Sequence, residues 1–445
     1  MKYFLAIDIG ATSGRHIVGW FDGAEGEFQP SKIQTEEVYR FPNGNKKDKG
    51  HLTWDIESLT ESVIEGTKKA LERFPEIESM AIDTWGVDYV LIDKDGEAIL
   101  PCYAYRDSRT EEPIKRVHSI IPFEELYKRT GIQFQTFNTV YQLYDDMEKG
   151  RLEGAVDFLM MPEYLSYVLT GVKKKEYTNA TTGGIVNTET KEYDKEIINK
   201  LGLPERLFGK LSQPGETVGM LKEEIAARVG GQIKVVLCAS HDTGSAVEGI
   251  GLEGYGDVYI SSGTWSLLGI KSPEAHTDEK SLEANYSNEG GVGYIRYLKN
   301  IMGMWTVNNL WRELCPDKKI QVIEQEARES KLPPEAYVDI NHEDFLAPES
   351  MAFTFKKHLK GYTIETEQDH FRCAFNSLAA SYKQAIDALE VAMGRTFDSI
   401  YIVGGGAKNR FLNELTEAAT GKKVIALPIE ATAIGNLTVQ IKAAL

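Results

Sequence analysis

The sequence has no apolar run long enough to cross a membrane, which takes roughly 18 consecutive apolar residues or more. Its N-terminal stretch 3–9 starts like a secretion signal, but Asp8 interrupts it too early for the apolar segment of a signal. We therefore expect a cytoplasmic protein that makes no contact with a membrane.

Cysteine is also scarce, with four residues in a chain of 445. Cys102, Cys238, Cys315 and Cys373 are far apart, and no two of them form a Cys-x-x-Cys pair. This spacing argues against a zinc site and against a disulfide framework, and it fits a protein of a reducing compartment.

Positive charge is in deficit, because 50 lysines and arginines face 67 aspartates and glutamates, for a net charge of −17. Such an excess of acid argues against a surface that binds nucleic acid. An acidic protein that binds an anionic nucleotide must supply backbone N–H groups, a few cations or a metal ion locally. The Gly-Lys-Ser/Thr ending of a Walker A loop is absent, so a nucleotide site of that kind is excluded.

What is present is the composition of an ordinary globular protein, with 42% hydrophobic and 26% charged residues. The length favours two or three domains. Residues 324–360 are charged and broken by prolines, and they are expected to form surface connections. Apolar residues recur at helical spacing in stretches that we predict as helices: 56–73, 123–150 with breaks at 131 and 133–138, a helix that ends at Gly171, and 368–394.

The chain opens with an apolar run at 3–9, a turn at 10–15 rich in small and hydroxyl residues, and a second run at 16–21, which together predict a hairpin. The N–H groups and hydroxyls of such a turn can bind phosphate oxygens. Asp8 can hold a metal ion, often through water, and Arg15 can add a positive charge. A plain hairpin needs the same turn residues, so both interpretations stand.

Polar residues also interrupt the apolar stretch 79–92, where Asp83, Trp85 and Asp88 surround Gly86. Buried polar groups need partners, so these side chains either bond neighbouring backbone or face a polar ligand. In the charged stretch 105–109, the adjacent Arg106 and Asp107 allow either an ion pair or the recognition of sugar hydroxyls.

The middle of the chain offers one carboxylate, Asp242, just after the apolar run 233–237 and among small residues. Ligand sites favour the ends of strands and the junction of two halves of a protein, so Asp242 is a candidate catalytic residue. The alternative is that Asp242 caps the helix that follows.

The second half repeats the opening pattern, because residues 257–270 again predict strand, Ser/Gly/Thr turn and strand about 250 residues later. This repetition suggests a duplicated fold. Residues 399–409 predict a strand, a turn of three glycines and a helix. Glycines allow the backbone to approach a flat ligand such as adenine.

The chain resembles the FGGY family of carbohydrate kinases, which share the actin-like ATPase fold. The stretches that carry the resemblance occur in the family's order over nearly the whole chain: 8–15, 82–88, 104–109, 177–182, 239–243, 261–267, 299–303 and 403–406. The resemblance implies an α/β protein of two actin-like (ribonuclease H-like) domains with a nucleotide and sugar cleft between them. Residues 1–247 would form the sugar-binding domain and 248–445 the nucleotide-binding domain.

The resemblance also implies transfer of the γ-phosphoryl group of ATP to O1 of L-rhamnulose in L-rhamnose breakdown, by a monomer or small homo-oligomer. Asp242 would accept the O1 proton, and Asp8 would help hold Mg2+. The nucleotide would be bound by Ala11, Thr12, Ser13, Gly14, Arg15, Thr264, Asn308, Gly404, Gly405 and Gly406. The sugar would be bound by Trp85, Gly86, Asp88, Arg106, His241, Thr243 and Asn300, with Trp85 against its methyl group.

Two other functions remain open at this stage. One is the same chemistry on another ketose, such as xylulose or fuculose. The other is an actin-like nucleotide-binding protein without kinase activity, which would need neither Asp242 nor the charged stretch 105–109. A sugar-responsive repressor is disfavoured because the sequence has no evident basic helix for reading DNA.

Overall fold

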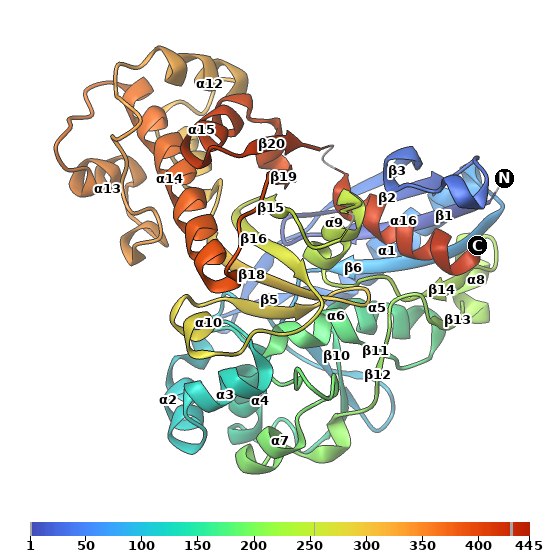
Figure 1. The fold of residues 1–445 in the computed structure, drawn as a ribbon. Coiled ribbons are helices and arrows are strands. Elements are labelled where there is room, and N and C mark those ends of the chain that lie inside the picture. Colours follow the sequence, from blue (N-terminus) through green and yellow to red (C-terminus); the bar gives the residue numbers. More distant parts are fainter. Residues whose placement is uncertain (1, 253, 428–429) are drawn as a thin grey trace. The chain divides into compact units, whose positions relative to one another are not determined.

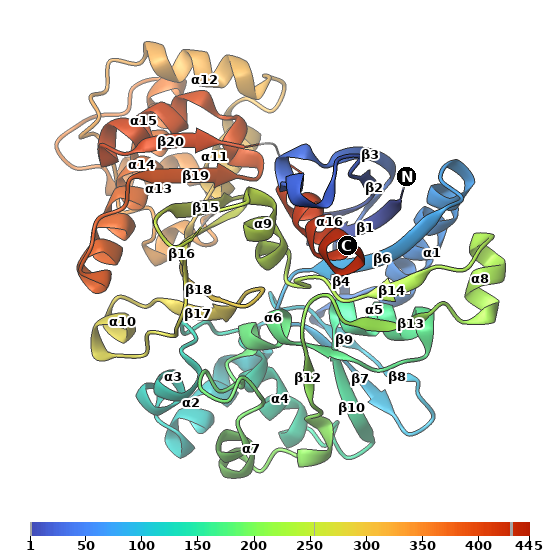
Figure 2. The ribbon, with the colours of Figure 1, turned by 45° about the vertical axis from the view of Figure 1, so that its right-hand side comes forward.

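The computed structural model describes residues 2–252, 254–427 and 430–445. The chain forms two compact units. Unit 1 comprises Met1–Gly251, Ser272–Tyr297 and Glu430–Leu445, and unit 2 comprises Leu252–Lys271 and Leu298–Ile429. The last helix therefore returns to the unit that holds the N-terminus, as its red ribbon beside the blue strands shows in Figures 1 and 2. The domain boundary at 247/248 stays a prediction.

Unit 1 is built on a six-stranded sheet with the order β13-β14-β6-β1-β2-β3. Smaller sheets join β10-β7-β8, β4-β5-β9 and β11-β12. The elements of unit 1 are β1 (Tyr3–Ile9), β2 (Ser13–Trp20), β3 (Gln34–Pro42), β4 (Asn45–Asp48), β5 (His51–Trp54), α1 (Ile56–Arg73), β6 (Ile77–Thr84), β7 (Tyr89–Asp93), β8 (Ala98–Ile99), β9 (Cys102–Tyr103), α2 (Glu111–Ile120), α3 (Phe123–Thr130), α4 (Thr139–Glu148), β10 (Ala155–Met160), α5 (Met161–Thr170), β11 (Lys175–Glu176), α6 (Tyr177–Ala180), α7 (Lys195–Leu201), β12 (Leu211–Ser212), β13 (Thr217–Met220), α8 (Glu223–Val229), β14 (Lys234–Val236), α9 (Asp242–Ile250), α10 (Glu279–Glu283), β17 (Ser287–Gly290) and α16 (Ala431–Ala444).

Strand β1 is apolar on both faces because helices cover both faces of its sheet. Leu5, Ile7 and Ile9 join one core with residues of α1 and α5, while Phe4 and Ala6 join another with α16. Side chains alternate between the two faces of a strand, so a strand covered on both sides reads as a continuous apolar run. This burial fixes the end of β1, where Asp8 lies.

Unit 2 is built on a sheet in which β18, β16, β15, β19 and β20 follow one another. Two of its strands extend into unit 1: β16 ends there and β18 begins there. The elements of unit 2 are β15 (Val258–Ser262), β16 (Trp265–Ser272), β18 (Ile295–Met302), α11 (Trp305–Leu314), α12 (Ile320–Glu329), α13 (Met351–His358), α14 (Glu367–Met393), β19 (Ser399–Val403), the 3-10 helix η7 (Gly405–Lys408), α15 (Arg410–Thr420) and β20 (Lys423–Ala426). The long helix α14 supplies much of the core, and it begins with a capping box formed by Thr366 and Asp369.

The two sheets share one strand order, which agrees with the duplicated fold suggested by the repeated hairpins. In unit 1, β1 pairs antiparallel with β2 and parallel with β6, and β6 pairs parallel with β14. In unit 2, β15 pairs antiparallel with β16 and parallel with β19, and β19 pairs parallel with β20. The third strands of the series, β3 and β18, each lie beside the second.

Most predicted elements are confirmed, including the helix at 56–73 and the long helix at 368–394, which begins one residue earlier and ends at Met393. The prediction for 324–360 is wrong in part, because α13 forms there and α12 extends into it. Apolar residues buried on one side, such as Ile323 and Phe355, support these helices despite the charged composition. Among the described helices, none combines the length and apolar character of a membrane span.

Candidate active site

Two carboxylates lie side by side where β1 and β6 end. Asp8 and Asp83 are partners in the parallel register of these strands, and Asp8 also faces Arg15 of β2. The Arg15 guanidinium lies 2.5 Å from the Asp8 carboxylate. Asp83 is fully buried and accepts a 2.6 Å hydrogen bond from the Asn436 amide on α16, while its Oδ1 has no hydrogen-bond partner.

This concentration of negative charge fits a cation. Burial raises the pKa of Asp8, although Arg15 acts against it, and Asp242 adds to the rise. Burial and then Asp8 raise the pKa of Asp83 well above its usual range, and Asp242 again contributes. The charges of Asp8, Asp83 and Asp242 thus repel one another, and the Arg15 guanidinium is the positive charge that offsets them. The unpartnered Oδ1 of Asp83 and the hard oxygen donors match what Mg2+ prefers.

The turn between β1 and β2 is held by hydrogen bonds from Asn43, which follows β3. Asn43 donates from its amide to the Gly10 carbonyl at 2.8 Å and from its backbone to the Thr12 carbonyl at 2.9 Å. Thr12 is exposed, and Ala11 and Ser13 are half-buried. The structure therefore presents the predicted phosphate turn as a fixed, accessible loop next to Asp8.

Asp242 is the first residue of α9, and the structure does not support its interpretation as the helix cap. His241 occupies the N-cap position, and no side chain caps this helix end. The Asp242 carboxylate is about one-third exposed and accepts a 3.1 Å hydrogen bond from Thr243 Oγ1. Its carboxylate is thus available to a ligand.

The segment before Asp242 is fixed by the end of β6 and by a buried glutamate. Thr84 donates from its backbone to the Ser240 carbonyl at 2.9 Å. Glu176, fully buried, accepts hydrogen bonds from the Ser240 hydroxyl at 2.5 Å and from the Thr178 and Asn179 backbone at 2.7 and 3.0 Å. The polar patch at 178–182 has neither helical nor strand periodicity in the sequence. In the structure it forms short helical turns beside this segment.

Among the predicted sugar residues in this region, Gly86 is required by a close contact, whereas Asp88 is held by hydrogen bonds within the protein. A Cβ on Gly86 would come within 2.8 Å of Thr182 Oγ1, so the chain needs glycine there. Asp88 is fully buried and accepts hydrogen bonds from Trp54, Trp85, Gln142 and the Tyr105 backbone. Burial raises its pKa to about 6 despite these bonds. This geometry does not favour the predicted contact of Asp88 with sugar, because its oxygens are already occupied.

Arg106 and Asp107 do not pair with each other. Asp107 caps a short 3-10 helix and accepts hydrogen bonds from His51 Nδ1 at 3.0 Å and the Leu52 backbone at 2.7 Å. Arg106 is exposed, lies over the Tyr105 ring and donates to its hydroxyl. No acidic partner of Arg106 is found in the part of the chain that the structure describes, so its guanidinium is available to a ligand.

In unit 2, two predicted nucleotide turns follow the ends of β15 and β19, while Asn308 of the predicted nucleotide set and Asn300 of the predicted sugar set lie on other elements. Thr264 forms the exposed turn after β15, and its carbonyl accepts a 3.1 Å hydrogen bond from the Trp305 backbone. Asn308 lies partly buried in the first turns of α11, and Asn300 lies partly buried on β18. The glycine turn 404–406 follows β19 directly.

The three glycines of that turn differ in their surroundings. Gly404 has a φ of 84°, and a Cβ there would lie 2.7 Å from the Ser262 carbonyl. A Cβ on Gly406 would lie 2.0 Å from Ser262 Oγ, whereas a Cβ on Gly405 would meet nothing within 4 Å. The fold itself therefore requires Gly404 and Gly406, and only Gly405 presents open backbone.

The sequence leaves Asp83 either bonded to backbone or facing a polar ligand, without a metal role, and it assigns no role to Glu289 and Arg296. Asp83 carries a signal, as an acidic residue inside an apolar strand. Glu289 and Arg296 carry none, because they reach His241 only through the fold, at 3.1 and 3.2 Å from its Nδ1.

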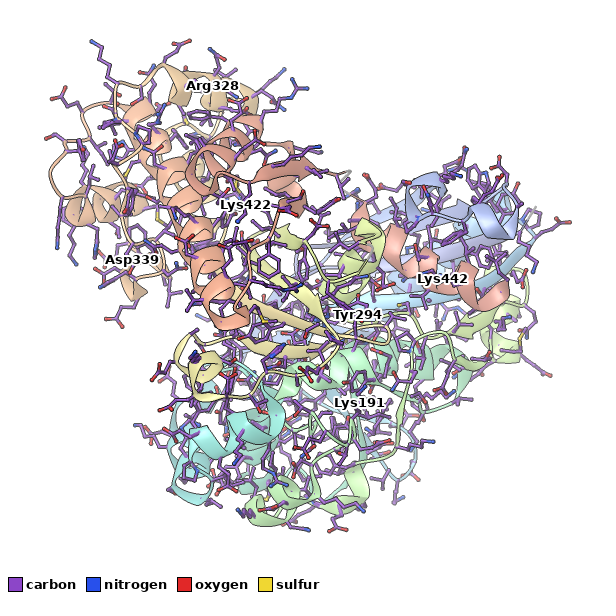
Figure 3. All side chains as sticks on the ribbon, viewed as in Figure 1. Lys191, Tyr294, Arg328, Asp339, Lys422 and Lys442 are labelled. Carbon is purple, nitrogen blue, oxygen red and sulfur yellow. The ribbon has the colours of Figure 1, made fainter. Side chains whose placement is uncertain are left out.

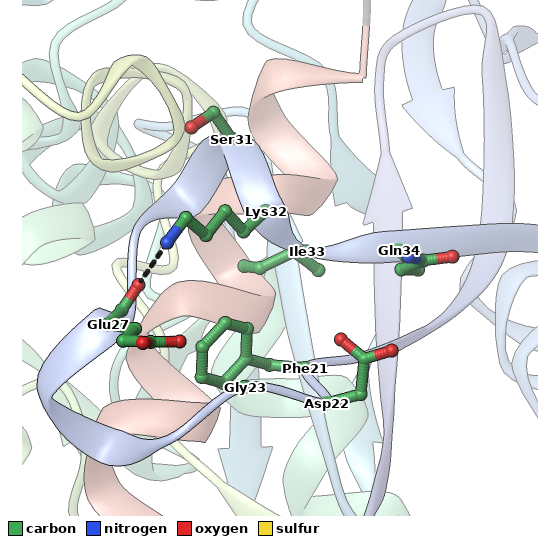
Figure 4. A pocket seen from close by; sticks show the side chains of 8 residues that line it. All are labelled: Phe21, Asp22, Gly23, Glu27, Ser31, Lys32, Ile33 and Gln34. Carbon is green, nitrogen blue, oxygen red and sulfur yellow. Dashed lines mark hydrogen bonds between the residues drawn. The ribbon is translucent and has the colours of Figure 1, made fainter.

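Two other features lie apart from these residues. An open hollow of about 550 Å3 in unit 1 contains none of the predicted site residues, and its Lys32 donates to the Glu27 carbonyl (Figure 4). In unit 2, His342, Asp344 and His358 are close enough to share a metal ion. Asp344 already accepts hydrogen bonds from Lys357 at 2.6 Å and His358 at 2.7 Å, so this cluster is neutralised without a metal.

The fold resembles those of solved structures. A ligand-bound xylulose kinase from Lactobacillus acidophilus aligns with a TM-score of 0.82 at 16% identity, over 100% of this chain and 90% of that chain. Plasmodium falciparum glycerol kinase with ADP aligns with a TM-score of 0.77 at 15% identity, over 99% and 90%. These similarities concern the fold alone, and they confirm the predicted α/β class with two actin-like domains.

Relatives of known name are similar in sequence over almost the whole chain. A rhamnulokinase of Oceanobacillus iheyensis is 41% identical over 449 residues, which cover 99% of this chain and 93% of the relative. A rhamnulokinase of Bacillus subtilis is 38% identical over 452 residues, with coverage of 99% and 90%. Models of the N-terminal and C-terminal domains of the FGGY family of carbohydrate kinases match residues 3–249 and 258–444. The chain therefore belongs to the FGGY family of carbohydrate kinases.

Proposed function

We propose that the protein transfers the γ-phosphoryl group of ATP to O1 of L-rhamnulose, giving L-rhamnulose 1-phosphate and ADP. The observation that carries this proposal is the Asp242 carboxylate, which starts α9 without capping it and whose charge helps to raise the pKa of Asp8 and of Asp83. The named relatives supply the identity of the sugar.

The reaction depends more on placement and charge than on covalent help from the protein. Asp242 takes the proton from O1 as the oxygen attacks the γ-phosphorus, and ADP leaves. The turn from Ala11 to Arg15 and the turn at Thr264 bind phosphate oxygens, while Asn308 and Gly405 lie along the nucleotide. Gly86, Arg106, His241, Thr243 and Asn300 contact the sugar, and Trp85 packs against its methyl group.

Asp8, with Asp83 beside it, would hold Mg2+, which neutralises charge on the phosphate oxygens when bound. We expect Asp8→Asn to raise the Mg2+ concentration for half-maximal rate by roughly 10- to 100-fold, the range for losing a partner of a metal's outer shell. A titration of initial rate with MgCl2 measures this. Asp157→Asn is the control, because Asp157 lies on β10 of the same unit and pairs there with Lys175 of β11. An unchanged titration in Asp8→Asn would make Asp8 a structural residue.

The nucleotide assignment predicts different results for two neighbouring glycines. Gly405→Val adds a side chain into open space, so it should raise the KM for ATP by about tenfold or more, or about 1.4 kcal/mol, at unchanged thermal stability. Gly406→Ala meets Ser262 and should instead lower stability by about 1–3 kcal/mol. Steady-state kinetics and thermal melts distinguish the two. If Gly405→Val binds ATP like the wild type, the glycine turn does not contact the nucleotide.

A panel of ketoses in a coupled ADP-release assay tests the substrate. We expect the highest kcat/KM with L-rhamnulose, and lower values with L-fuculose and D-xylulose. A preference for another ketose would overturn the sugar assignment and keep the chemistry. ADP release that is independent of every sugar would favour the alternative without kinase activity.

A further inference from the structure

Asp88 joins three segments of unit 1 that are distant from one another in sequence. Its Oδ2 accepts hydrogen bonds from Trp54 Nε1 at 2.7 Å, Trp85 Nε1 at 3.0 Å and the Tyr105 backbone at 3.0 Å. Its Oδ1 accepts a hydrogen bond from Gln142 Nε2 at 3.2 Å. Burial raises the pKa of Asp88 to about 6, so at neutral pH it is mainly an anion. Hydrogen bonds to an ionised acceptor are stronger than those between neutral groups.

The two indoles that bond to Asp88 also stack on each other. The ring centroids of Trp54 and Trp85 lie 4.1 Å apart, with 35° between the planes. Trp54 ends β5 and Trp85 follows β6, so the two rings meet only through the fold. Both side chains are buried. Neither indole can turn without breaking its hydrogen bond to Asp88, and the carboxylate therefore fixes the orientation of the Trp85 ring.

The backbone between Trp85 and Asp88 is strained at Val87. This buried residue has a φ of 65°, and across it the Asp88 N–H donates to the Gly86 carbonyl at 2.9 Å. The arrangement is the rare form of γ-turn, and a positive φ is unfavourable for a β-branched residue. The other described non-glycine residues with a positive φ, among them the exposed Lys191 labelled in Figure 3, are not β-branched. Such strain persists only where the surroundings impose it, and it is common at ligand sites.

Side chains from three other positions impose this turn. The Val87 N–H donates to Thr182 Oγ1 at 3.0 Å. The Val87 carbonyl accepts hydrogen bonds from Thr139 Oγ1 at 2.7 Å and from Gln142 Nε2 at 3.3 Å. Because Gln142 also donates to Asp88, the strained turn and the carboxylate are held together.

The turn lies beside the segment that carries the proposed base. The Asn179 amide donates to the Trp85 carbonyl at 3.4 Å and to the Ser240 carbonyl at 3.2 Å, so one side chain bonds both segments. Asp242 follows Ser240 closely in the chain. The Trp85 segment is thus fixed next to the proposed site of phosphoryl transfer.

The third segment that Asp88 holds carries Arg106. The Arg106 guanidinium lies over the Tyr105 ring and donates to the Tyr105 hydroxyl at 3.1 Å. Burial raises the pKa of Tyr105, although Arg106 acts against it, and the charges of Asp88 and Asp242 add to the rise. Asp88 therefore anchors two of the segments to which the proposed function gives sugar contacts.

We propose that Asp88 is a positioning residue that sets the preference for a 6-deoxy ketose, because it holds the Trp85 indole and the backbone before Arg106 in place at the sugar. The inference rests on the proposed function for the ketose and for the contact of Trp85 with the methyl group. L-Fructose is the matched probe, because it differs from L-rhamnulose only by a hydroxyl on that methyl carbon.

The first test compares the two ketoses in the wild type and in Asp88→Asn. The wild type should favour L-rhamnulose in kcat/KM by roughly 100-fold, as an apolar pocket does against an added hydroxyl. The amide of Asp88→Asn has one acceptor oxygen in place of two, so donors on one side lose their partner. We expect the preference to fall about tenfold or more, the effect of losing a hydrogen bond to a charged group, at an unchanged KM for ATP.

The second test is spectroscopic and needs no substrate. Stacked indoles couple their electronic transitions, so the wild type should show an exciton couplet in far-ultraviolet circular dichroism. Trp54→Phe identifies this couplet by removing it. Asp88→Asn should weaken the couplet, because the two rings lose their common acceptor. Trp54→Phe should also lower the preference for L-rhamnulose by roughly 2- to 10-fold, the range for an aromatic pair, and this holds the test if Asp88→Asn does not fold.

The matched control is Asp194→Asn, which removes a buried carboxylate that pairs with Arg129 at 2.8 Å elsewhere in unit 1. It should lower the melting temperature and leave both the couplet and the sugar preference unchanged. If Asp88→Asn behaves like this control, Asp88 is merely structural and the inference fails. A wild-type preference in Trp54→Phe would likewise contradict it. If the wild type phosphorylates no ketose, the proposed function fails, whereas an unchanged couplet in Asp88→Asn overturns the positioning role by itself.

Discussion

Asp242→Asn should lose roughly two to four orders of magnitude in kcat, the range for losing a positioned general base, while the protein stays folded and binds ATP. The fold should tolerate the change because Asp242 does not cap α9 and accepts a hydrogen bond only from the adjacent Thr243 among the described side chains. Single-turnover rates, thermal melts and ATP binding together measure the effect.

Asp55 is the matched contrast for Asp242, since it also stands at the start of a helix. Its side chain accepts a 3.0 Å hydrogen bond from the Ser58 backbone and caps α1. Asp55→Ala should therefore lose about 0.5–2 kcal/mol of stability with kcat unchanged. Asp242→Ala should instead keep the stability of the wild type and lose kcat. A kcat like that of the wild type in either Asp242 variant would refute its role as base.

The second large effect concerns the crossing of α9 and α16, where a glycine on each helix allows the two backbones to approach closely. A Cβ on Gly435 would lie 1.7 Å from the Ser245 carbonyl oxygen, and one on Gly249 would lie 2.0 Å from the Ala431 carbonyl oxygen. Backbone atoms cannot rotate away as a side chain does. Gly435→Ala should therefore destabilise unit 1 by about 3 kcal/mol or more, at or beyond the usual range for overpacking.

This crossing also matters for the site. The helix α16 carries Asn436, which donates to Asp83, and Gln440, which donates to the Leu5 carbonyl at 3.0 Å. Gly435→Ala should thus lower both the melting temperature and the activity of the folded fraction. Gly44→Ala is the control, because Gly44 is exposed and a Cβ there meets nothing within 4 Å. A melting temperature of Gly435→Ala within about 1 °C of the wild type would contradict the packing described.

The sequence predicts the elements whose pattern is local. The run in β1 is continuous because both faces of its sheet are covered, and α1 combines helical spacing with a capping aspartate. The repeated hairpins suggest a duplicated fold, and each hairpin supplies two adjacent strands of its sheet in the same place of the strand order. The resemblance then names the family, which the domain models confirm.

The rest depends on contacts between distant residues. Asp83 meets Asn436, 353 positions away, and His241 meets Glu289 and Arg296 only through the β17–β18 hairpin. The glycine turn looks uniform in sequence, yet Ser262 from another strand decides which glycine is open. The apolar side of α12 and α13 is hidden in the sequence by surrounding charge and proline.

Transfer to the sugar rather than to water is the central claim, and the phosphorus product tests it most directly. With ATP, MgCl2 and L-rhamnulose, 31P NMR should show a phosphate monoester that grows together with ADP and whose phosphorus couples to the two C1 protons. The same mixture without sugar should form little inorganic phosphate. Inorganic phosphate as the main product, at a rate that L-rhamnulose does not change, would contradict the account.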